Sequence, residues 1–350
     1  MGVGSTHLSL LSAVFAGTAL IQAASARLQP LDVHKLTTPV GFGTYLEPEL
    51  LRRWRPVFAP LEPQKGWISR LQNVTARVYS QGRQDSVLAL IFDSIGVTNC
   101  FAVEFGFDSP TYEGGSGSNT LFLHRAGGFQ TLLLDGEFSN ASINLHAHFL
   151  YANNVAELFH RYGVPQEPDF VSCDMDSHDA FVLRAILKAG FRPRVITAEY
   201  NLNWGTSATR TWTMVDPTLR TGSLPPGEHY LPFTCAWGAS MGTLKAIADE
   251  FGYAIVAVVG VMDLVWIRRD VLDPTALRHV PTWDQLAAQV PRMNLLHAPT
   301  YPAYLQRVID YGVWHETGSV DKAREAARRT MLNATVKHPC YASALAVSGA

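Results

Sequence analysis

The densest group of reactive side chains in the sequence lies after a short apolar run, where Asp174, Asp176, His178 and Asp179 follow one another closely. On an extended chain, side chains two residues apart point to the same side, so Asp174 and Asp176 are expected to act together. Such a pair can orient a cofactor, bind a divalent cation or remove a proton from a substrate. We take Asp174, Asp176 and His178 as candidate catalytic residues, while Asp179 is also suited simply to begin the next helix.

A second group of polar residues ends the earlier apolar run 101–107. It contains Glu104, Gly106 and Asp108. A glycine here lets the backbone approach a nucleotide-like ligand closely, and the carboxylate of Glu104 can hold a cationic amine. A tight turn with a solvated acid explains the same residues equally well. The run lacks the G-x-G-x-x-G spacing of NAD-type loops.

Further polar residues stand at corresponding places along the chain. Asp135 follows the apolar run 129–134, where an acid can accept hydrogen bonds from ribose hydroxyls. Glu137 competes for that role, and an Asp-Gly turn is the simpler alternative. Asn119, which follows a Gly- and Ser-rich loop, and Glu199, near the end of the run 194–200, complete the candidates for ligand binding.

Alternating strands and helices must position these residues. Periodicity predicts helices over 84–95, 118–126, 155–162, 177–190 and 239–251, and strands over 101–107, 129–134, 148–151, 169–175 and 194–200. Two closing strands, 253–259 and 264–267, are spaced as in an antiparallel hairpin. Strands separated by helices imply right-handed crossovers and a mostly parallel sheet, in which ligands bind at the carboxyl ends of the strands. The predicted fold class is therefore α/β.

The composition supports a folded domain. Of the 350 residues, 47% are hydrophobic and 17% are charged, which excludes a disordered chain. The formal net charge is -2 and no long lysine or arginine run is present, so we do not expect nucleic acid as a partner. The oligomeric state is left open.

The N-terminus has the features of an export signal. An uncharged apolar run over 7–24 precedes Ala24-Ser25-Ala26, a site of the kind that signal peptidase accepts. We therefore predict a signal peptide over 1–26 and a secreted or lumenal protein. No Lys or Arg precedes the run, so an uncleaved membrane anchor over 8–24 is the alternative.

Sequons and cysteines add little to that prediction. Asn73, Asn140 and Asn333 each begin an N-x-S/T triplet, which supports a glycoprotein weakly. Four cysteines allow three disulfide pairings, but Cys173 lies in an apolar run and is equally suited to be a buried thiol.

Domain boundaries follow from these patterns. Residues 27–77 form an irregular extension, 78–271 the α/β domain and 272–350 a helical extension that includes a helix over 321–332. The long loop 201–238 is the expected contact surface for a substrate. Its Trp204, Trp212 and Tyr230 are candidate ring platforms, with packing beneath the loop as the alternative.

Six short segments occur in order along the chain, and they are Tyr79–Asp85, Val103–Gly106, Gly115–Thr120, Leu132–Gly136, Pro168–Asp176 and Arg192–Ile196. Together they resemble the FkbM-like branch of the class I S-adenosylmethionine-dependent methyltransferases. The resemblance implies a Rossmann-like fold with a mostly parallel seven-stranded sheet, an antiparallel last strand and S-adenosyl-L-methionine as cofactor. It further implies that Glu104 and Gly106 hold the methionine end, that Asp135 contacts the ribose, and that Asp174 or Asp176 lines the site.

The leading hypothesis is therefore O-methylation of a hydroxyl on a sugar, lipid or small metabolite. One alternative is a non-enzymatic exported domain that binds a glycan or a partner. Another is a metal-dependent glycosyltransferase that uses Asp174 and Asp176 as a D-x-D site. The spacings of His146, His148 and His160 match no recognised ligand set, and we assign no metal ligand.

Overall fold

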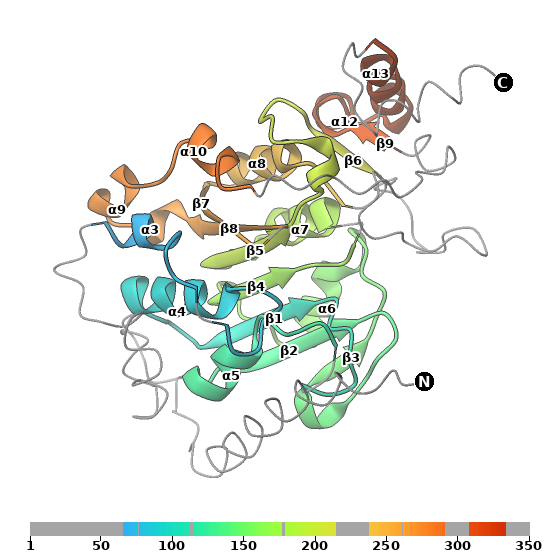
Figure 1. Ribbon diagram of the computed structural model, residues 1–350. Coiled ribbons are helices and arrows are strands. Elements are labelled where there is room, and N and C mark those ends of the chain that lie inside the picture. Colours follow the sequence, from blue (N-terminus) through green and yellow to red (C-terminus); the bar gives the residue numbers. More distant parts are fainter. Residues whose placement is uncertain are drawn as a thin grey trace, which may run out of the picture.

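The structure is a computed structural model, and it describes residues 66–75, 77–112, 115–176, 179–214, 238–260, 262–290 and 308–333 (Figure 1). The predicted signal peptide, residues 27–65 and 76 of the extension, His178 and residues 215–237 of the long loop lie outside these ranges. In the part described, no helix has both the length and the apolar character needed to cross a bilayer.

A seven-stranded, mostly parallel sheet forms the centre of the domain, as the sequence predicts. Its strands lie in the order β3-β2-β1-β4-β5-β8-β7. The strand β8 runs antiparallel to both of its neighbours, and the pairs among the first five strands of this order are parallel. This arrangement is consistent with a Rossmann-like fold. The strands are β1 (Phe101–Phe105), β2 (Gln130–Asp135), β3 (Leu145–Ala147), β4 (Phe170–Cys173), β5 (Val195–Glu199), β7 (Tyr253–Val259) and β8 (Asp263–Arg268).

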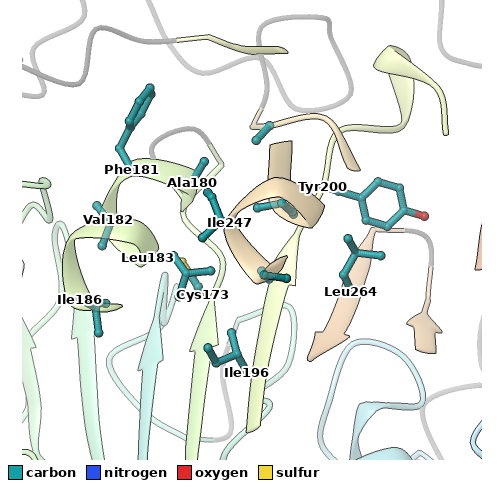
Figure 2. Packing of buried hydrophobic residues seen from close by; sticks show 14 of the residues in the cluster. Cys173, Ala180, Phe181, Val182, Leu183, Ile186, Ile196, Tyr200, Ile247 and Leu264 are labelled. Atoms are coloured by element: carbon teal, nitrogen blue, oxygen red, sulfur yellow. The ribbon is translucent and has the colours of Figure 1, made fainter. Parts of the chain in front are cut away.

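Helices cover both faces of the sheet, because alternate strand residues supply apolar side chains to each face (Figure 1). One hydrophobic layer joins the sheet to α3 (Trp67–Arg70), α4 (Gln84–Ile95), α5 (Leu121–Gly127) and α9 (Pro274–Arg278). The other joins it to α6 (Val155–Arg161), α7 (Asp179–Lys188), α8 (Met241–Glu250), α10 (Trp283–Ala287), α12 (Tyr311–Thr317) and α13 (Val320–Asn333). Figure 2 shows Cys173 of β4 in this second layer, together with Leu183 of α7 and Ile247 of α8.

Most elements agree with the predicted ranges, but the third strand was placed wrongly. It was expected over 148–151 and is observed as β3, three residues earlier in the chain. The apolar residues that suggested the later position, Leu150 and Tyr151, are buried, at 8% and 7% exposed, but they follow the strand and do not belong to it. The strand itself contributes only one buried apolar side chain, Leu145, and therefore leaves a weak pattern in the sequence.

The long loop contains structure that its composition did not indicate. Residues 202–204 form a short 3-10 helix, and β6 (Trp212–Met214) pairs antiparallel with β9 (Val308–Asp310) as a separate two-stranded sheet. Trp204 and Trp212 are buried and meet edge to face, with their ring centroids 5.1 Å apart. The prediction that these two rings are exposed platforms is therefore wrong, and the alternative, that they pack beneath the loop, is correct. Tyr230 lies outside the described residues.

Candidate functional site

The carboxyl ends of the parallel strands meet at Gly106, where the order of the sheet changes direction between β1 and β4. The Gly106 amide donates to the carbonyl of Leu134, one residue before Asp135, at 3.0 Å. On its other side a Cβ would lie 1.9 Å from the Asp174 carbonyl oxygen, and φ is +69°. Only glycine fits between the ends of β2 and β4 in this way. The predicted residues Gly106, Asp135 and Asp174 are thus brought together.

Glu104 makes contacts within the protein that the sequence does not predict. Its side chain is buried, and its two carboxylate oxygens face residues 118–120 at the beginning of α5. Oε1 accepts from the Asn119 amide at 2.7 Å, whereas Oε2 accepts from the hydroxyls of Ser118 and Thr120 and from the Thr120 amide. Burial raises the pKa of Glu104, and these donors offset part of that effect. The carboxylate holds this loop in place and does not face open space.

A polar row runs across the central strands beside that loop. In the ladder, Glu104 is opposite Ser172, and Ser172 is opposite Thr197. Asn119 Nδ2 donates to Ser172 Oγ at 2.9 Å, and Thr197 Oγ1 donates to the same atom at 3.0 Å. Asn119 therefore joins the loop to the sheet through both its backbone and its side chain.

Asp135 both makes a turn and retains an oxygen for another contact. Its Oδ1 accepts from the backbone amides of Glu137 at 2.7 Å and Phe138 at 2.9 Å, as the Asp-Gly turn alternative requires. Within the described residues no hydrogen bond reaches Oδ2, and the residue is half-buried. Glu137 is exposed. The carboxylate of Asp108 accepts from the Ser116 amide at 3.1 Å and closes the loop between them.

Three carboxylates converge beyond Gly106 on the side of β4 and β5. One carboxylate oxygen from each of Asp174, Asp176 and Glu199 lies within 4.8 Å of the other two. Glu199 was expected to be polar at the ligand edge, but sequence reasoning did not connect it to the other two acids. Asp176 is exposed, Asp174 is half-buried and Glu199 is buried. The side chains of Asp174 and Asp176 come together, but not on an extended chain as the sequence predicts. The backbone turns at Asp176, whose φ of 59° is left-handed.

The electrostatic environment of these acids is strongly negative. Burial raises the pKa of Asp174 well above its usual value, and neighbouring carboxylates, first that of Asp263, raise it further. The pKa of Glu199 is raised in the same way, by burial first and then by the charge of Asp174. Two carboxyl groups this close and this buried cannot both remain ionised without a compensating positive charge.

Asp179 and Asp263 support this cluster without joining it. Asp179 begins α7, and its Oδ1 accepts from the Met175 amide at 2.8 Å, which holds the turn after β4. Asp263 is opposite Glu199 in the ladder, and its Oδ2 accepts from Gln84 Nε2 at 2.6 Å. Burial raises the pKa of Asp263 to about 6. Sequence reasoning missed both Gln84 and Asp263.

The segment before α4 closes one side of this edge. Three consecutive backbone amides, from Val78 to Ser80, donate to Asp85 Oδ2 at 2.7–2.9 Å. The Ser118 amide donates to the Tyr79 carbonyl at 3.1 Å, so this segment lies against the loop that Glu104 holds. The segments 79–85 and 115–120, which are far apart in the sequence, are thus in contact in the fold.

The histidines considered as ligands are engaged elsewhere. His146 stacks on Tyr162 with centroids 4.1 Å apart, His148 Nε2 lies 2.6 Å from the Tyr162 hydroxyl, and His160 packs near Phe191. Cys100 and Cys173 are buried thiols, while Cys235 and Cys340 lie outside the described residues.

Models of known protein families do not match the chain, and neither do curated protein sequences. The site itself must therefore carry the functional argument. It combines a glycine at the reversal of the sheet, a partly unengaged carboxylate at Asp135, and a carboxylate cluster around Asp174.

Proposed function

We propose that the protein is an S-adenosylmethionine-dependent methyltransferase, which transfers a methyl group to a hydroxyl of a sugar, lipid or small metabolite. The observation that carries this proposal is the position of Gly106, between the ends of β2 and β4, where the sheet order reverses. Ligands of open α/β sheets bind at this point, outside the carboxyl ends of the strands.

The residues around Gly106 fit such a cofactor. Asp135 Oδ2 is suited to accept from a ribose hydroxyl, because Oδ1 alone makes the turn. The negative charge near Asp174 favours a ligand that carries a sulfonium and an ammonium group. Glu104 is assigned an indirect role, since its oxygens hold residues 118–120. Asp108 and Glu137 stay as predicted contacts.

When bound, S-adenosylmethionine supplies an electrophilic methyl group. The protein must orient the acceptor oxygen towards it, and positioning alone can account for much of the rate increase. A carboxylate must also receive the hydroxyl proton. Asp174 is suited to that task because burial raises its pKa well above the usual value of an aspartate, and Asp176 is the exposed alternative. The predicted role of His178 falls on a residue outside the described ranges.

Calorimetric titration with S-adenosylhomocysteine tests the cofactor assignment. We expect binding by the full chain, and about tenfold weaker binding by Asp135→Asn, because a hydrogen bond to a charged group contributes about 1.5 kcal/mol or more. The matched control is Glu157→Gln, which removes one exposed carboxylate that pairs with Arg161 on α6. A wild-type chain that binds neither S-adenosylmethionine nor its demethylated product would overturn the proposal.

A binding-only protein is the alternative that shares this geometry. It would bind the cofactor product but would not transfer tritium from methyl-labelled S-adenosylmethionine to any hydroxyl compound in a panel of sugars, lipids and small metabolites. Transfer that is lost in Asp174→Asn but kept in Glu157→Gln would support the enzyme.

A further inference from the structure

The carboxylate of Glu199 is buried at this edge of the sheet. The residue is only 3% exposed, and among the described residues its Oε2 atom has no hydrogen-bond partner. One of its oxygens lies within 4.8 Å of oxygens of both Asp174 and Asp176, so the side chain is directed into the cluster. A buried acceptor in this state is unfavourable unless something positive or protonated lies beside it.

In the part of the chain that the structure describes, the carboxyl of Asp174 is the hydrogen-bonding neighbour of Glu199, and that group carries no positive charge. No ion pair there joins Asp174 or Glu199 to a Lys, Arg or His side chain. The nearest charged neighbours are instead acidic, because Asp179 and Asp263 add to the negative potential. Their hydrogen bonds to Met175 and Gln84 keep both of these carboxylates in position.

We propose that Asp174, Asp176 and Glu199 form a binding site for a hard divalent cation of the size of Ca²⁺ or Mn²⁺. All three ligands are carboxylate oxygens, which favour such ions over the softer metals that cysteine and histidine bind. Ligand distances of about 2.3–2.6 Å let one Ca²⁺ span oxygens about 5 Å apart. The three oxygens therefore lie within reach of a single ion without movement of the backbone.

The arrangement leaves part of the coordination sphere open. Glu199 closes the site from the buried side, whereas Asp176 lies at the exposed side. A Ca²⁺ ion takes six to eight oxygen ligands, so positions remain for water or for an oxygen of a substrate. The cation site shares Asp174 and Asp176 with the proposed methyl transfer, but it can be tested separately because cation binding is measured without S-adenosylmethionine.

Titration of the EDTA-stripped full chain with Mn²⁺, followed by the electron paramagnetic resonance signal of the unbound ion, tests the site. We expect one ion per chain, competition by Ca²⁺, and at least tenfold weaker binding in the isosteric variants Glu199→Gln and Asp174→Asn. Glu157→Gln, which removes the same charge from an exposed surface, should bind as the wild type does. Circular dichroism verifies that each variant is folded.

A second measurement needs no variant. Saturating Ca²⁺ should raise the melting temperature of the wild-type chain, because an ion that binds only the folded state stabilises it. A wild-type chain that neither binds Mn²⁺ nor responds to Ca²⁺ would overturn the site and would indicate a carboxyl pair that shares a proton. Unchanged Mn²⁺ affinity in Glu199→Gln would overturn it as well. Both measurements omit S-adenosylmethionine, so failure here is distinct from failure of the proposed function.

Discussion

Replacement of Glu104 by glutamine is expected to loosen the loop at the beginning of α5. In the wild type, Oε1 accepts from the Asn119 amide, and Oε2 accepts from Ser118 and Thr120. A glutamine can place its oxygen towards only one of these two sets, so its NH₂ group must face a buried donor on the other side. A donor left without an acceptor costs about 1–3 kcal/mol.

A second effect acts in the opposite direction. Burial raises the pKa of Glu104, which shows that the folded protein disfavours the charge at this position. Removal of the charge relieves part of that penalty, so we expect a net loss near the middle of the range, about 2 kcal/mol of unfolding free energy. Local opening of the loop should then become roughly 30-fold more frequent, since 1.4 kcal/mol corresponds to a factor of ten.

Amide hydrogen exchange is the appropriate assay because it reports on individual amides even where global unfolding is not two-state. Exchange should accelerate at Asn119 and Thr120 but not in β7, which lies at the end of the sheet, four strands from β1. The control Glu137→Gln changes an exposed glutamate and should leave both protection and urea unfolding within about 0.5 kcal/mol of the wild type. Unchanged protection at residues 119 and 120 in Glu104→Gln would refute the role assigned to this carboxylate.

Three further predictions follow from buried or close contacts. Gly106→Ala should lower the free energy of unfolding by about 3 kcal/mol or more, because the added Cβ would lie 1.9 Å from a backbone oxygen. The control Gly128→Ala has a similar φ of +68° but open space around the Cβ, and it should lower the free energy of unfolding by about 1 kcal/mol. Equal losses in urea unfolding would contradict the close approach at Gly106. Asp169→Asn removes the carboxylate charge whose Oδ1 lies 2.7 Å from a guanidinium nitrogen of buried Arg194, and it should lower the free energy of unfolding by about 3–5 kcal/mol. A clearly smaller loss in urea unfolding would show that water reaches this ion pair in solution. Burial raises the pKa of the Cys100 thiol to about 12, so the reactive thiolate is scarce at pH 8. Iodoacetamide should therefore label Cys100 only when the protein is unfolded in urea. Peptide mapping that finds Cys100 labelled in the folded chain would contradict its burial.

The fold was predictable where local patterns are strong. The helical period from Gln84 and the stop at Gly96 mark α4 correctly, and the short spacer after Val259 indicates the hairpin of β7 and β8. The pattern failed at β3, because an edge strand with one buried apolar residue contributes little periodicity. The pattern also failed at β6, because this three-residue strand is defined by its pairing with β9, which lies far away in the sequence.

The site was predictable as a set of strand ends, but the roles of its members were not. The sequence places Glu104, Asp135 and Asp174 at one edge, because parallel strands end on the same side. It does not show that a loop folds back on Glu104 and takes its hydrogen bonds. Nor does it show that Glu199 reaches the acids after β4, since that contact depends on how two strands align.

The position of β8 has a consequence for how the chain assembles. The ribosome releases β7 before β8, yet within the described residues β7 pairs with β8 alone, which lies between β7 and β5. Strand β7 therefore joins the sheet through β8, and until residue 268 has emerged β5 presents an unpaired edge that can recruit other chains. The carboxylate of Asp263 joins those of Asp174 and Glu199 only when β8 pairs with β5. The group of carboxylates around Asp174 is thus completed only after a stage of synthesis at which the nascent chain presents an unpaired strand edge.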